Sequence, residues 1–275
     1  MRLVSLTCSN TEIVQALGRV EWLVGVDDHS DWPPAIEDLP RVGPDLHIDL
    51  DAVDALRPDL VLASLTVPGH EHVVAGLEAR GLPFIAPEPT SLADVARDIR
   101  EIGAALGLAA RAEVVAQDFE AAMVPDAVEG EPVRIGVEWW PKPVYVPGRH
   151  SWVSDLLELA GAVNPFAAHP GGADAKSFAV APEDAVAAQL EAVVISWCGV
   201  PEDKYRPRIV RERPGWSEVP AVQDDHIVPI SEAWLGRPGP RLVEGLAALR
   251  AVVADVHARR RSRSESAVTS AREVP

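Results

Sequence analysis

Residues 49–86 read DLDAVDALRPDLVLASLTVPGHEHVVAGLEARGLPFIA and alternate amphipathic segments with short apolar runs. This alternation predicts a helix, a strand, a second helix and a second strand, over 49–56, 60–64, 72–79 and 84–86. Gly81 is placed to end the second helix, because glycine readily takes the left-handed backbone that follows a last helical turn. Apolar strands separated by helices are typical of a parallel sheet covered by helices.

The same alternation continues on both sides of this segment. Towards the N-terminus it predicts a strand, a helix and a second strand, over 2–6, 10–17 and 23–26. After Pro132 it predicts further strands over 133–137, 192–196 and 226–230, and further helices over 153–159, 183–189 and 240–258. The sequence therefore predicts an α/β protein with two lobes, each built around a parallel sheet flanked by helices.

Residues 91–131 interrupt the alternation, because they contain no predicted strand. Gly103 and Gly107 are expected to break a first helix, and a second helix is predicted over about 109–128. At 1.5 Å per residue this second helix would be about 30 Å long, enough to reach from one lobe to the other. The alternative is a helical hairpin packed on a single domain.

The chain of 275 residues is long enough for two lobes, each with its own core. We expect four parts in order: an N-terminal lobe, a helical segment that contains the interlobe helix, a C-terminal lobe, and a disordered basic, Ser-rich tail. Their predicted limits are 1–90, 91–131, 132–258 and 259–275.

The formal charge of −17 bears on the partners of the protein. An acidic surface repels phosphate backbones and anionic lipid headgroups, so nucleic acid is not an expected partner. No stretch reaches the roughly 20 apolar residues of a membrane span, so no membrane insertion is expected. The first residues lead directly into a predicted strand rather than into a secretory signal. As written, the sequence indicates a cytoplasmic protein, and an extracytoplasmic one if a leader is missing.

Catalytic and metal-binding motifs are absent from the sequence. It contains no Gly-x-Ser-x-Gly, no Gly-rich phosphate loop and no His-Glu-x-x-His, so we expect a binding protein without catalytic residues. Cys8 and Cys198 lie too far apart in sequence to suggest a disulfide framework. His70 and His72 could share a metal, but a zinc site needs three or four ligands, so no metal site of the protein itself is expected.

Tryptophan is used unusually often, with eight Trp against four Phe and two Tyr. Several follow predicted strands, where open α/β sheets place their ligands. A flat ligand needs aromatic walls for contact area. The tryptophans predicted to line a pocket are Trp32, Trp139, Trp140, Trp197 and Trp234.

Polar side chains on the same loops are candidates for orienting a ligand. They are His29, Asp31, Asp45, His70, His72, Arg149, His150 and Glu232. A histidine could also hydrogen-bond a ligand or ligate a metal that the ligand carries, and His29 and His70 are the candidates for that role.

Five segments, in their order and spacing, resemble the periplasmic binding proteins that carry vitamin B12, haem and ferric siderophores, and the cobalamin-binding branch most of all. They are SLTCSNTE over 5–12, VGVDDHSDWPP over 24–34, LDAVDALRPDLV over 50–61, LLELAGAVN over 156–164 and RPGPRL over 237–242. This resemblance implies the class III fold, in which two lobes with central parallel sheets are joined by one long spanning helix.

The resemblance also implies the substrate-binding component of an ABC importer. Such a protein captures cobalamin or a related metal chelate between its lobes, needs no covalently held cofactor, and docks as a monomer on a permease dimer. Asp51 and Glu183 match the acidic docking residue on each lobe. The alternatives are a cytosolic sensor or chaperone for a corrinoid, haem or siderophore, and a chelatase-like enzyme.

The sequence departs from the cobalamin-binding pattern at the expected ligand contacts. His29, Asp45 and Ser64 occupy positions where those proteins carry aromatic clamp residues. Glu232 lies near the position of their acidic contact. The resemblance therefore leaves cobalamin, haem and a ferric siderophore open as the ligand.

Overall fold

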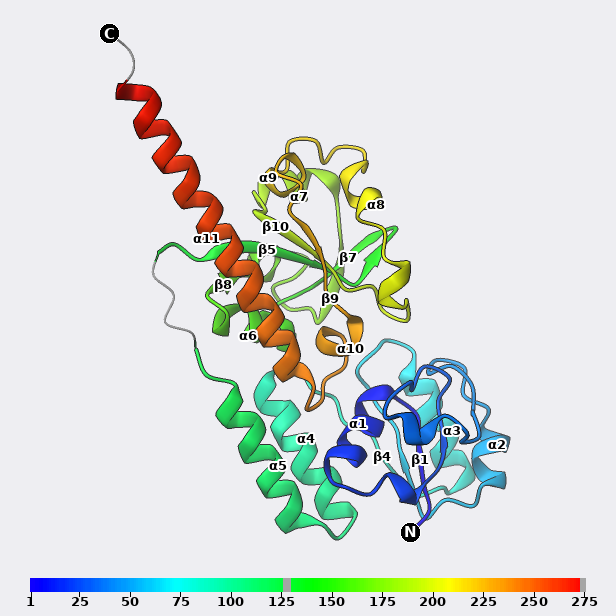
Figure 1. Cartoon of the computed structure of the whole chain (residues 1–275). Helices are drawn as coiled ribbons and strands as arrows, with labels where there is room; N and C mark the ends of the chain where they lie inside the picture. Colours follow the sequence, from blue (N-terminus) through cyan, green and yellow to red (C-terminus); the bar gives the residue numbers. More distant parts are fainter. Residues whose placement is uncertain (126–129, 273–275) are drawn as a thin grey trace. The chain divides into compact units, whose positions relative to one another are not determined.

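The computed structural model describes residues 1–125 and 130–272, with side chains to residue 265. The chain divides into two compact units (Figure 1). Unit 1 consists of Met1–Ala122 together with Arg237–Leu242, and unit 2 of Met123–Gly236 together with Val243–Pro275. The helical segment after residue 91 thus lies in unit 1, which is longer than the predicted lobe over 1–90.

Unit 1 contains a four-stranded parallel sheet in the order β2-β1-β3-β4. The strands are β1 (Leu3–Ser5), β2 (Leu23–Val26), β3 (Leu60–Leu62) and β4 (Phe84–Ile85). The helices between them are α1 (Cys8–Ala16), η1 (Val20–Trp22), η2 (Pro34–Ile36), α2 (Leu50–Ala55) and α3 (His70–Arg80). All four strands run the same way, so their carboxyl ends share one edge of the sheet.

The apolar residues of residues 49–86 form the centre of the unit 1 core. Val53 from α2, Val61 from β3 and Leu77 from α3 are fully buried against Val4 of β1. The carboxylate of Asp49 caps α2 by accepting hydrogen bonds from two backbone amides. Gly81 ends α3 with φ of 66°, as predicted. Local signals and tertiary packing agree along this segment, which explains why its sequence could be interpreted directly.

Helices α4 (Leu92–Ala105) and α5 (Ala109–Ala122) lie side by side as a hairpin in unit 1 (Figure 1). The side chain of Ser91 caps α4 by accepting a hydrogen bond from the amide of Asp94. Gly103 does not break α4 but allows the close approach of α5, since a Cβ there would lie 2.1 Å from the Cβ of Ala112.

The helix predicted over 109–128 is therefore shorter than expected. Residues 123–125 are not helical, and residues 126–129 lie outside the described part of the chain. The hairpin alternative describes α4 and α5, because both helices bury their apolar residues within unit 1.

Unit 2 contains a second parallel sheet in the order β11-β10-β5-β8. Its strands are β5 (Val133–Glu138), β8 (Ala162–Val163), β10 (Ala192–Ile195) and β11 (Ile227–Pro229). An antiparallel sheet in the order β6-β7-β9 was not predicted. It consists of β6 (Trp140–Pro141), β7 (Val144–Pro147) and β9 (Ser177–Val180).

The helices of unit 2 are mostly short, except for the last. The short ones are α6 (Trp152–Leu159), η3 (Pro165–Ala168), α7 (Pro182–Ala187), η4 (Glu202–Lys204), α8 (Pro207–Arg211), α9 (Pro220–Gln223) and α10 (Glu232–Leu235). Apolar residues of α7, α8 and α9 belong to one core cluster with the large buried side chains Phe166, Trp197 and Trp216.

The last helix, α11, covers Leu242–Arg272, so the prediction of a disordered tail from residue 259 is wrong as far as residue 272. Its arginines have carboxylate partners within unit 2. Arg260 lies 2.6 Å from Glu191, and Arg259 makes an i,i+4 pair with Asp255. The basic run therefore forms part of a folded helix, and residues 273–275 lie outside the described chain.

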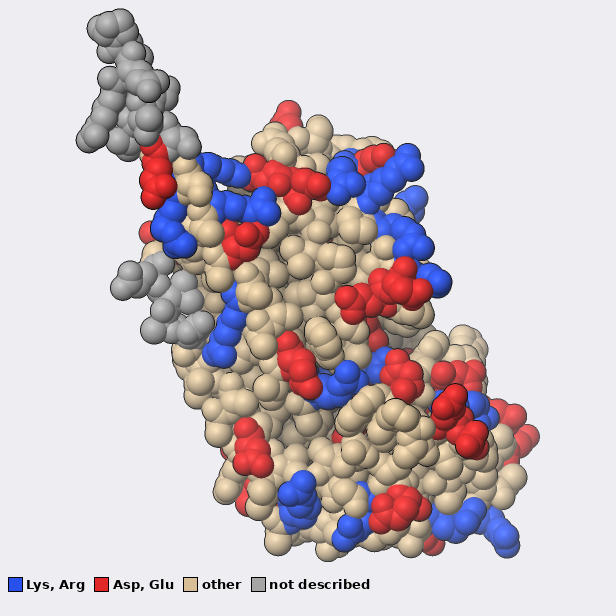
Figure 2. Space-filling model, viewed as in Figure 1, with Lys and Arg blue, Asp and Glu red and all other residues tan. Residues whose placement is uncertain are grey.

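The charged groups of the surface are interspersed, as Figure 2 shows for the face in view. On the α4–α5 hairpin, for example, Arg100 pairs with Glu113 at 2.8 Å and with Glu120 at 2.7 Å. Among the described residues, no helix combines the length and the apolar character that crossing a bilayer requires.

Candidate functional site

The loops that follow β2 and β3, residues 27–49 and 63–69, form what we call the unit 1 rim. They lie at the carboxyl edge of the sheet, where open α/β folds place ligands. The rim brings His29 and Asp45 together with His70, the first residue of α3. The Nε2 atom of His29 lies 3.9 Å from Asp45 Oδ1, and that of His70 lies 3.5 Å from Asp45 Oδ2. Three residues predicted separately thus form one polar cluster.

Within this cluster the two histidines differ in exposure. The side chain of His29 is 45% exposed, whereas that of His70 is 4% exposed. His70 Nδ1 accepts a hydrogen bond from the amide of Val67 at 3.4 Å, and its Nε2 faces Asp45. The interaction with the His70 imidazole is the main cause that lowers the pKa of Asp45. His70 is therefore buried beneath the loop, whereas His29 is the accessible imidazole.

The pair His70 and His72 does not form a metal site. His72 is exposed while His70 is buried, so the two imidazoles point to different environments. Glu71 between them accepts a hydrogen bond from the amide of Gly69 at 2.7 Å. Among the described residues, no three His, Cys, Asp or Glu side chains are arranged to hold a metal ion.

Asp27 fixes the loop that carries His29, and sequence patterns did not single it out. It is fully buried at the end of β2, and its carboxylate accepts hydrogen bonds from the amide of His29 at 3.0 Å and from the hydroxyl of Ser30. Burial raises the pKa of Asp27, which the hydrogen bond from Ser30 partly offsets. The sequence signal for Asp27 is its position directly after an apolar strand. Asp28 follows the same strand, so this signal alone does not show which of the two aspartates fixes the loop.

Trp32 is half-buried, and the guanidinium of Arg241 lies 5.0 Å from the centre of its ring. Asp31 beside it is paired with Arg237 at 2.6 Å, and Arg237 and Arg241 both approach the buried carboxylate of Glu12. Burial tends to raise the pKa of Asp31, but the hydrogen bond from Arg237 and its charge lower it overall. Asp31 thus binds the segment Arg237–Leu242 to unit 1, whereas the Trp32 ring remains partly accessible.

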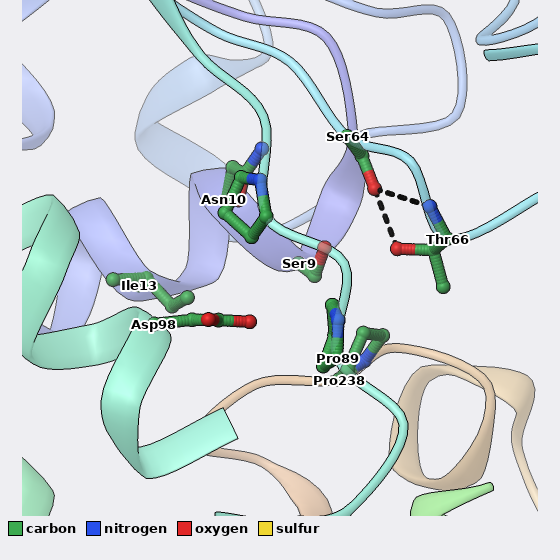
Figure 3. A pocket seen from close by; sticks show the side chains of 9 residues that line it. Ser9, Asn10, Ile13, Ser64, Thr66, Pro89, Asp98 and Pro238 are labelled. Atoms are coloured by element: carbon green, nitrogen blue, oxygen red, sulfur yellow. Dashed lines mark hydrogen bonds between the residues drawn. The ribbon is translucent and has the colours of Figure 1, made fainter. Parts of the chain in front are cut away.

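A small pocket lies at the carboxyl ends of β1, β3 and β4 (Figure 3). It encloses about 200 Å³ when its solvent-open part is included. Ser64, a predicted ligand residue, is in its wall, and its hydroxyl lies 2.5 Å from that of Thr66. On the other side, the carboxylate of Asp98 points from α4 into the space (Figure 3).

The segments after β5 and β11, residues 139–151 and 230–236, form what we call the unit 2 rim. Trp140 is 45% exposed, and its indole donates a hydrogen bond to the carbonyl of Lys142. Trp139 is half-buried, and Arg149 and His150 are exposed. The β6–β7 hairpin thus presents aromatic and basic groups to solvent.

Trp197 does not belong to this surface, contrary to the prediction. Its side chain is 3% exposed and packs edge-on against Tyr205 in the unit 2 core. Its indole donates a hydrogen bond at 3.2 Å to Glu138, which is also paired with Arg213. Glu138 and Arg213 are 75 residues apart, so no local sequence pattern could have indicated this buried ion pair.

Glu232 and Trp234 lie on the short helix α10 and are both half-buried. The amide of Glu232 donates a hydrogen bond to the hydroxyl of Tyr205 at 3.1 Å, which fixes the start of α10. Burial raises the pKa of Tyr205, so this hydroxyl stays protonated.

The two predicted docking residues occupy similar positions in their own units. Asp51 lies in the first turn of α2 with its side chain 90% exposed, and it pairs with Arg80 at 2.8 Å. Glu183 lies in the first turn of α7 and is exposed. Both carboxylates are favoured there by the helix dipole, and both are accessible to a partner.

Residues 3–233 match the family model described as periplasmic binding protein. The chain belongs to the periplasmic binding protein family. Among curated members, the uncharacterised ABC transporter substrate-binding lipoprotein YvrC of Bacillus subtilis is 26% identical over 254 residues, covering 89% of this chain and 77% of that protein. The vitamin B12-binding protein of Vibrio parahaemolyticus is 26% identical over 250 residues, covering 89% and 86%.

Solved structures of the family agree with the fold. The apo periplasmic haem-binding protein RhuT of Roseiflexus matches with a TM-score of 0.79 at 27% identity, covering 93% of this chain and 98% of that one. The vitamin B12-binding protein BtuF of Vibrio cholerae matches with a TM-score of 0.71 at 23% identity, covering 93% and 97%. The predicted fold class and family are confirmed, and the relatives named are binding proteins rather than enzymes.

Proposed function

We propose that the chain is the substrate-binding component of an ABC importer and that its ligand is cobalamin or a related metal chelate. The observation that carries this proposal is the family match over residues 3–233, together with relatives that are named for vitamin B12 and haem. The periplasmic and lipoprotein relatives support an extracytoplasmic location. We further propose that it works as a monomer and does not bind nucleic acid.

The proposed ligand contacts are the accessible side chains of the two rims. In unit 1 they are His29, Trp32, Asp45 and Ser64, and in unit 2 they are Trp139, Trp140, Arg149, Glu232 and Trp234. The exposed imidazole of His29, held beside Asp45, can donate a hydrogen bond to an axial group of a chelate or ligate its metal. The tryptophans supply flat apolar area.

Tryptophan fluorescence during titration with cyanocobalamin, haemin and a ferric hydroxamate tests the ligand class. At least one of them should quench the emission and saturate. Trp32→Phe should weaken binding and reduce the quenching. Trp22→Phe is the matched control, since Trp22 is also half-buried beneath an arginine but precedes β2 instead of following it. Three flat titrations would remove the chelate proposal.

A permease is the second proposed partner, and Asp51 and Glu183 are its proposed contacts. The double variant Asp51→Ala/Glu183→Ala should bind ligand with unchanged affinity but fail to stimulate the ATPase of the permease in proteoliposomes. A control variant, Asp54→Ala/Glu158→Ala, removes two other exposed carboxylates from α2 and α6 and should stimulate normally. Loss of ligand affinity in the first variant would instead assign these residues to the pocket.

A further inference from the structure

The pocket in unit 1 is built where three strands end. Ser9 and Asn10 come from the start of α1 after β1, Ser64 and Thr66 follow β3, and Pro89 follows β4. The pocket therefore opens at the same edge of the sheet as the unit 1 rim, and it shares Ser64 with the proposed ligand contacts. A ligand lying on this edge would reach the pocket with a side group rather than with its main body.

Asp98 is the charged group of this pocket. The residue is 3% exposed, and its Oδ1 accepts a hydrogen bond from Arg97 at 3.1 Å. Its Oδ2 is buried, and within residues 1–125 and 130–272 no hydrogen-bond partner reaches it. A buried carboxylate oxygen without a partner loses its hydration without compensation, so this arrangement is costly to the free protein.

The walls of the pocket explain why no partner reaches Asp98 Oδ2. Pro87, Pro89 and Pro238 are part of them, and proline has no backbone N–H to donate. The side-chain amide of Asn10 donates to the carbonyl of Ala63 at 2.7 Å. The hydroxyls of Ser64 and Thr66 are within hydrogen-bond distance of each other. None of these groups lies within hydrogen-bond distance of Asp98 Oδ2.

The innermost space is about the size of one water molecule. It accepts an NH₂, NH₃⁺ or OH group but neither a ring nor a second carboxylate, which Asp98 would repel. Burial raises the pKa of Asp98 to about 6, so the carboxylate is ionised at neutral pH and accepts hydrogen bonds. The site therefore discriminates by polarity: it favours a small donor and opposes an anion.

We propose that the pocket at Asp98 is a subsite for a hydrogen-bond-donating side arm of the ligand, a primary amide, and that it disfavours ligands whose side arms are carboxylates. This inference rests on the proposed function, since it requires a chelate bound at the unit 1 rim. Among the chelates considered, it selects the corrinoids, whose side arms are amides, over haem, whose side arms are propionates.

Two corrinoids that differ in their side arms test the proposal directly. Dicyanocobinamide carries amides, and dicyanocobyrinic acid carries carboxylates at the same positions of the ring. By calorimetry at pH 7.5, the amide form should bind at least about tenfold more tightly, as expected for one charge-assisted hydrogen bond. Equal affinities for the two would overturn the proposal.

Asp98→Asn provides the sharper arm of the test. Because Arg97 donates to Oδ1, the amide oxygen of the new side chain takes that position and its NH₂ group turns into the pocket. The pocket then offers a donor where it offered an acceptor, so the preference for the amide corrinoid should disappear or reverse. An unchanged preference in this variant would also contradict the inference.

Glu101→Ala is the matched control. It removes an exposed carboxylate of the same helix but leaves Asp98 and its hydrogen bond from Arg97 in place, so the preference for amide side arms should remain. Thermal unfolding of both variants checks that they are folded. If the wild-type protein binds no corrinoid, no haemin and no ferric hydroxamate, the proposed function fails; if it binds a chelate but without preference for amide over carboxylate side arms, only the subsite fails.

Discussion

The two rims differ in how their side chains are used. In the unit 1 rim the polar groups are held in networks, as with His29, Asp45 and His70, and Asp98 faces a pocket at the same edge of the sheet. In the unit 2 rim, Trp140 and Tyr145 are 45% and 40% exposed, whereas the charged group beneath, Glu138, is enclosed by Arg213 and Trp197. Under the proposed function, unit 1 would therefore contribute polar contacts to a ligand, whereas the exposed side chains of unit 2 would contribute mainly apolar area.

The largest expected effect concerns the ion pair under the unit 2 rim. Glu138→Gln leaves the guanidinium of Arg213 buried without a counter-charge, so it should lower the free energy of unfolding by about 3–5 kcal/mol. Urea unfolding followed by circular dichroism measures this. Glu138→Leu combined with Arg213→Met removes both charges and should cost less. A loss below about 1 kcal/mol in the single variant would show that the pair behaves like a surface one.

In unit 1, removing the charge of the buried carboxylate of Asp98 should raise the free energy of unfolding instead of lowering it. The pKa of Asp98 is raised from 3.8 to about 6 in the folded protein, so the folded state binds its proton more tightly than the unfolded state does. Its contribution to stability is most favourable below pH 3.8 and is lost as the pH rises through about 6. Asp98→Asn should therefore stabilise the protein by about 2–3 kcal/mol at pH 8 and by little at pH 3.5. Unfolding at both pH values measures the difference, and an equal effect at both would exclude this explanation.

Trp140 and Trp197 separate ligand contact from packing in unit 2. Trp140→Ala should change the free energy of unfolding by less than about 0.5 kcal/mol, because the side chain is exposed, yet weaken ligand binding roughly three- to tenfold. Trp197→Phe should lower the free energy of unfolding but leave ligand affinity unchanged, because it leaves a cavity in the core and removes a hydrogen-bond donor to Glu138. Calorimetric titration and urea unfolding of both variants test this. Equal losses of affinity would show that Trp197, although buried in the core, also shapes the ligand-binding surface of the unit 2 rim.

The smallest effect is expected at the surface of unit 1. Asp51→Asn removes an ion pair with Arg80, but Asp51 is 90% exposed, so the free energy of unfolding should fall by no more than about 0.5 kcal/mol. Thermal unfolding at low and at high salt measures this. A larger loss that persists at high salt would assign Asp51 a structural role and weaken its proposed role in docking.

The sequence predicted the fold well where short-range signals and packing coincide. The helix–strand alternation of residues 49–86 predicted α2, β3, α3 and β4, and Gly81 ends α3 as expected. The same reasoning identified the four strands of the unit 1 sheet and β5, β10 and β11 of unit 2, but it missed the two-residue strand β8. It missed the antiparallel β6-β7-β9 sheet, because β6 has only two residues and pairs with a strand that follows after a two-residue turn.

The candidate site was predicted less completely, because its geometry depends on contacts between distant residues. Positions in loops after strands singled out His29, Asp45 and His70 one by one, but they could not show that the three lie together, that His70 is buried or that Trp197 packs in the core. The sequence does not mark Asp98 as a site residue, because it looks like any polar residue on an amphipathic helix. Only the three loops packed against it show that it faces a pocket.

The segment Arg237–Leu242 has a consequence for the timing of synthesis. Unit 1 begins with the first residue, but the two guanidinium groups that neutralise its buried Glu12 come from this segment, more than two hundred residues later. At 5–20 residues per second, the ribosome makes residues 123–236 in roughly 6–23 s. During that interval unit 1 lacks the segment Arg237–Leu242. The nascent chain therefore exposes an incompletely folded domain, which is the kind of surface that chaperones bind.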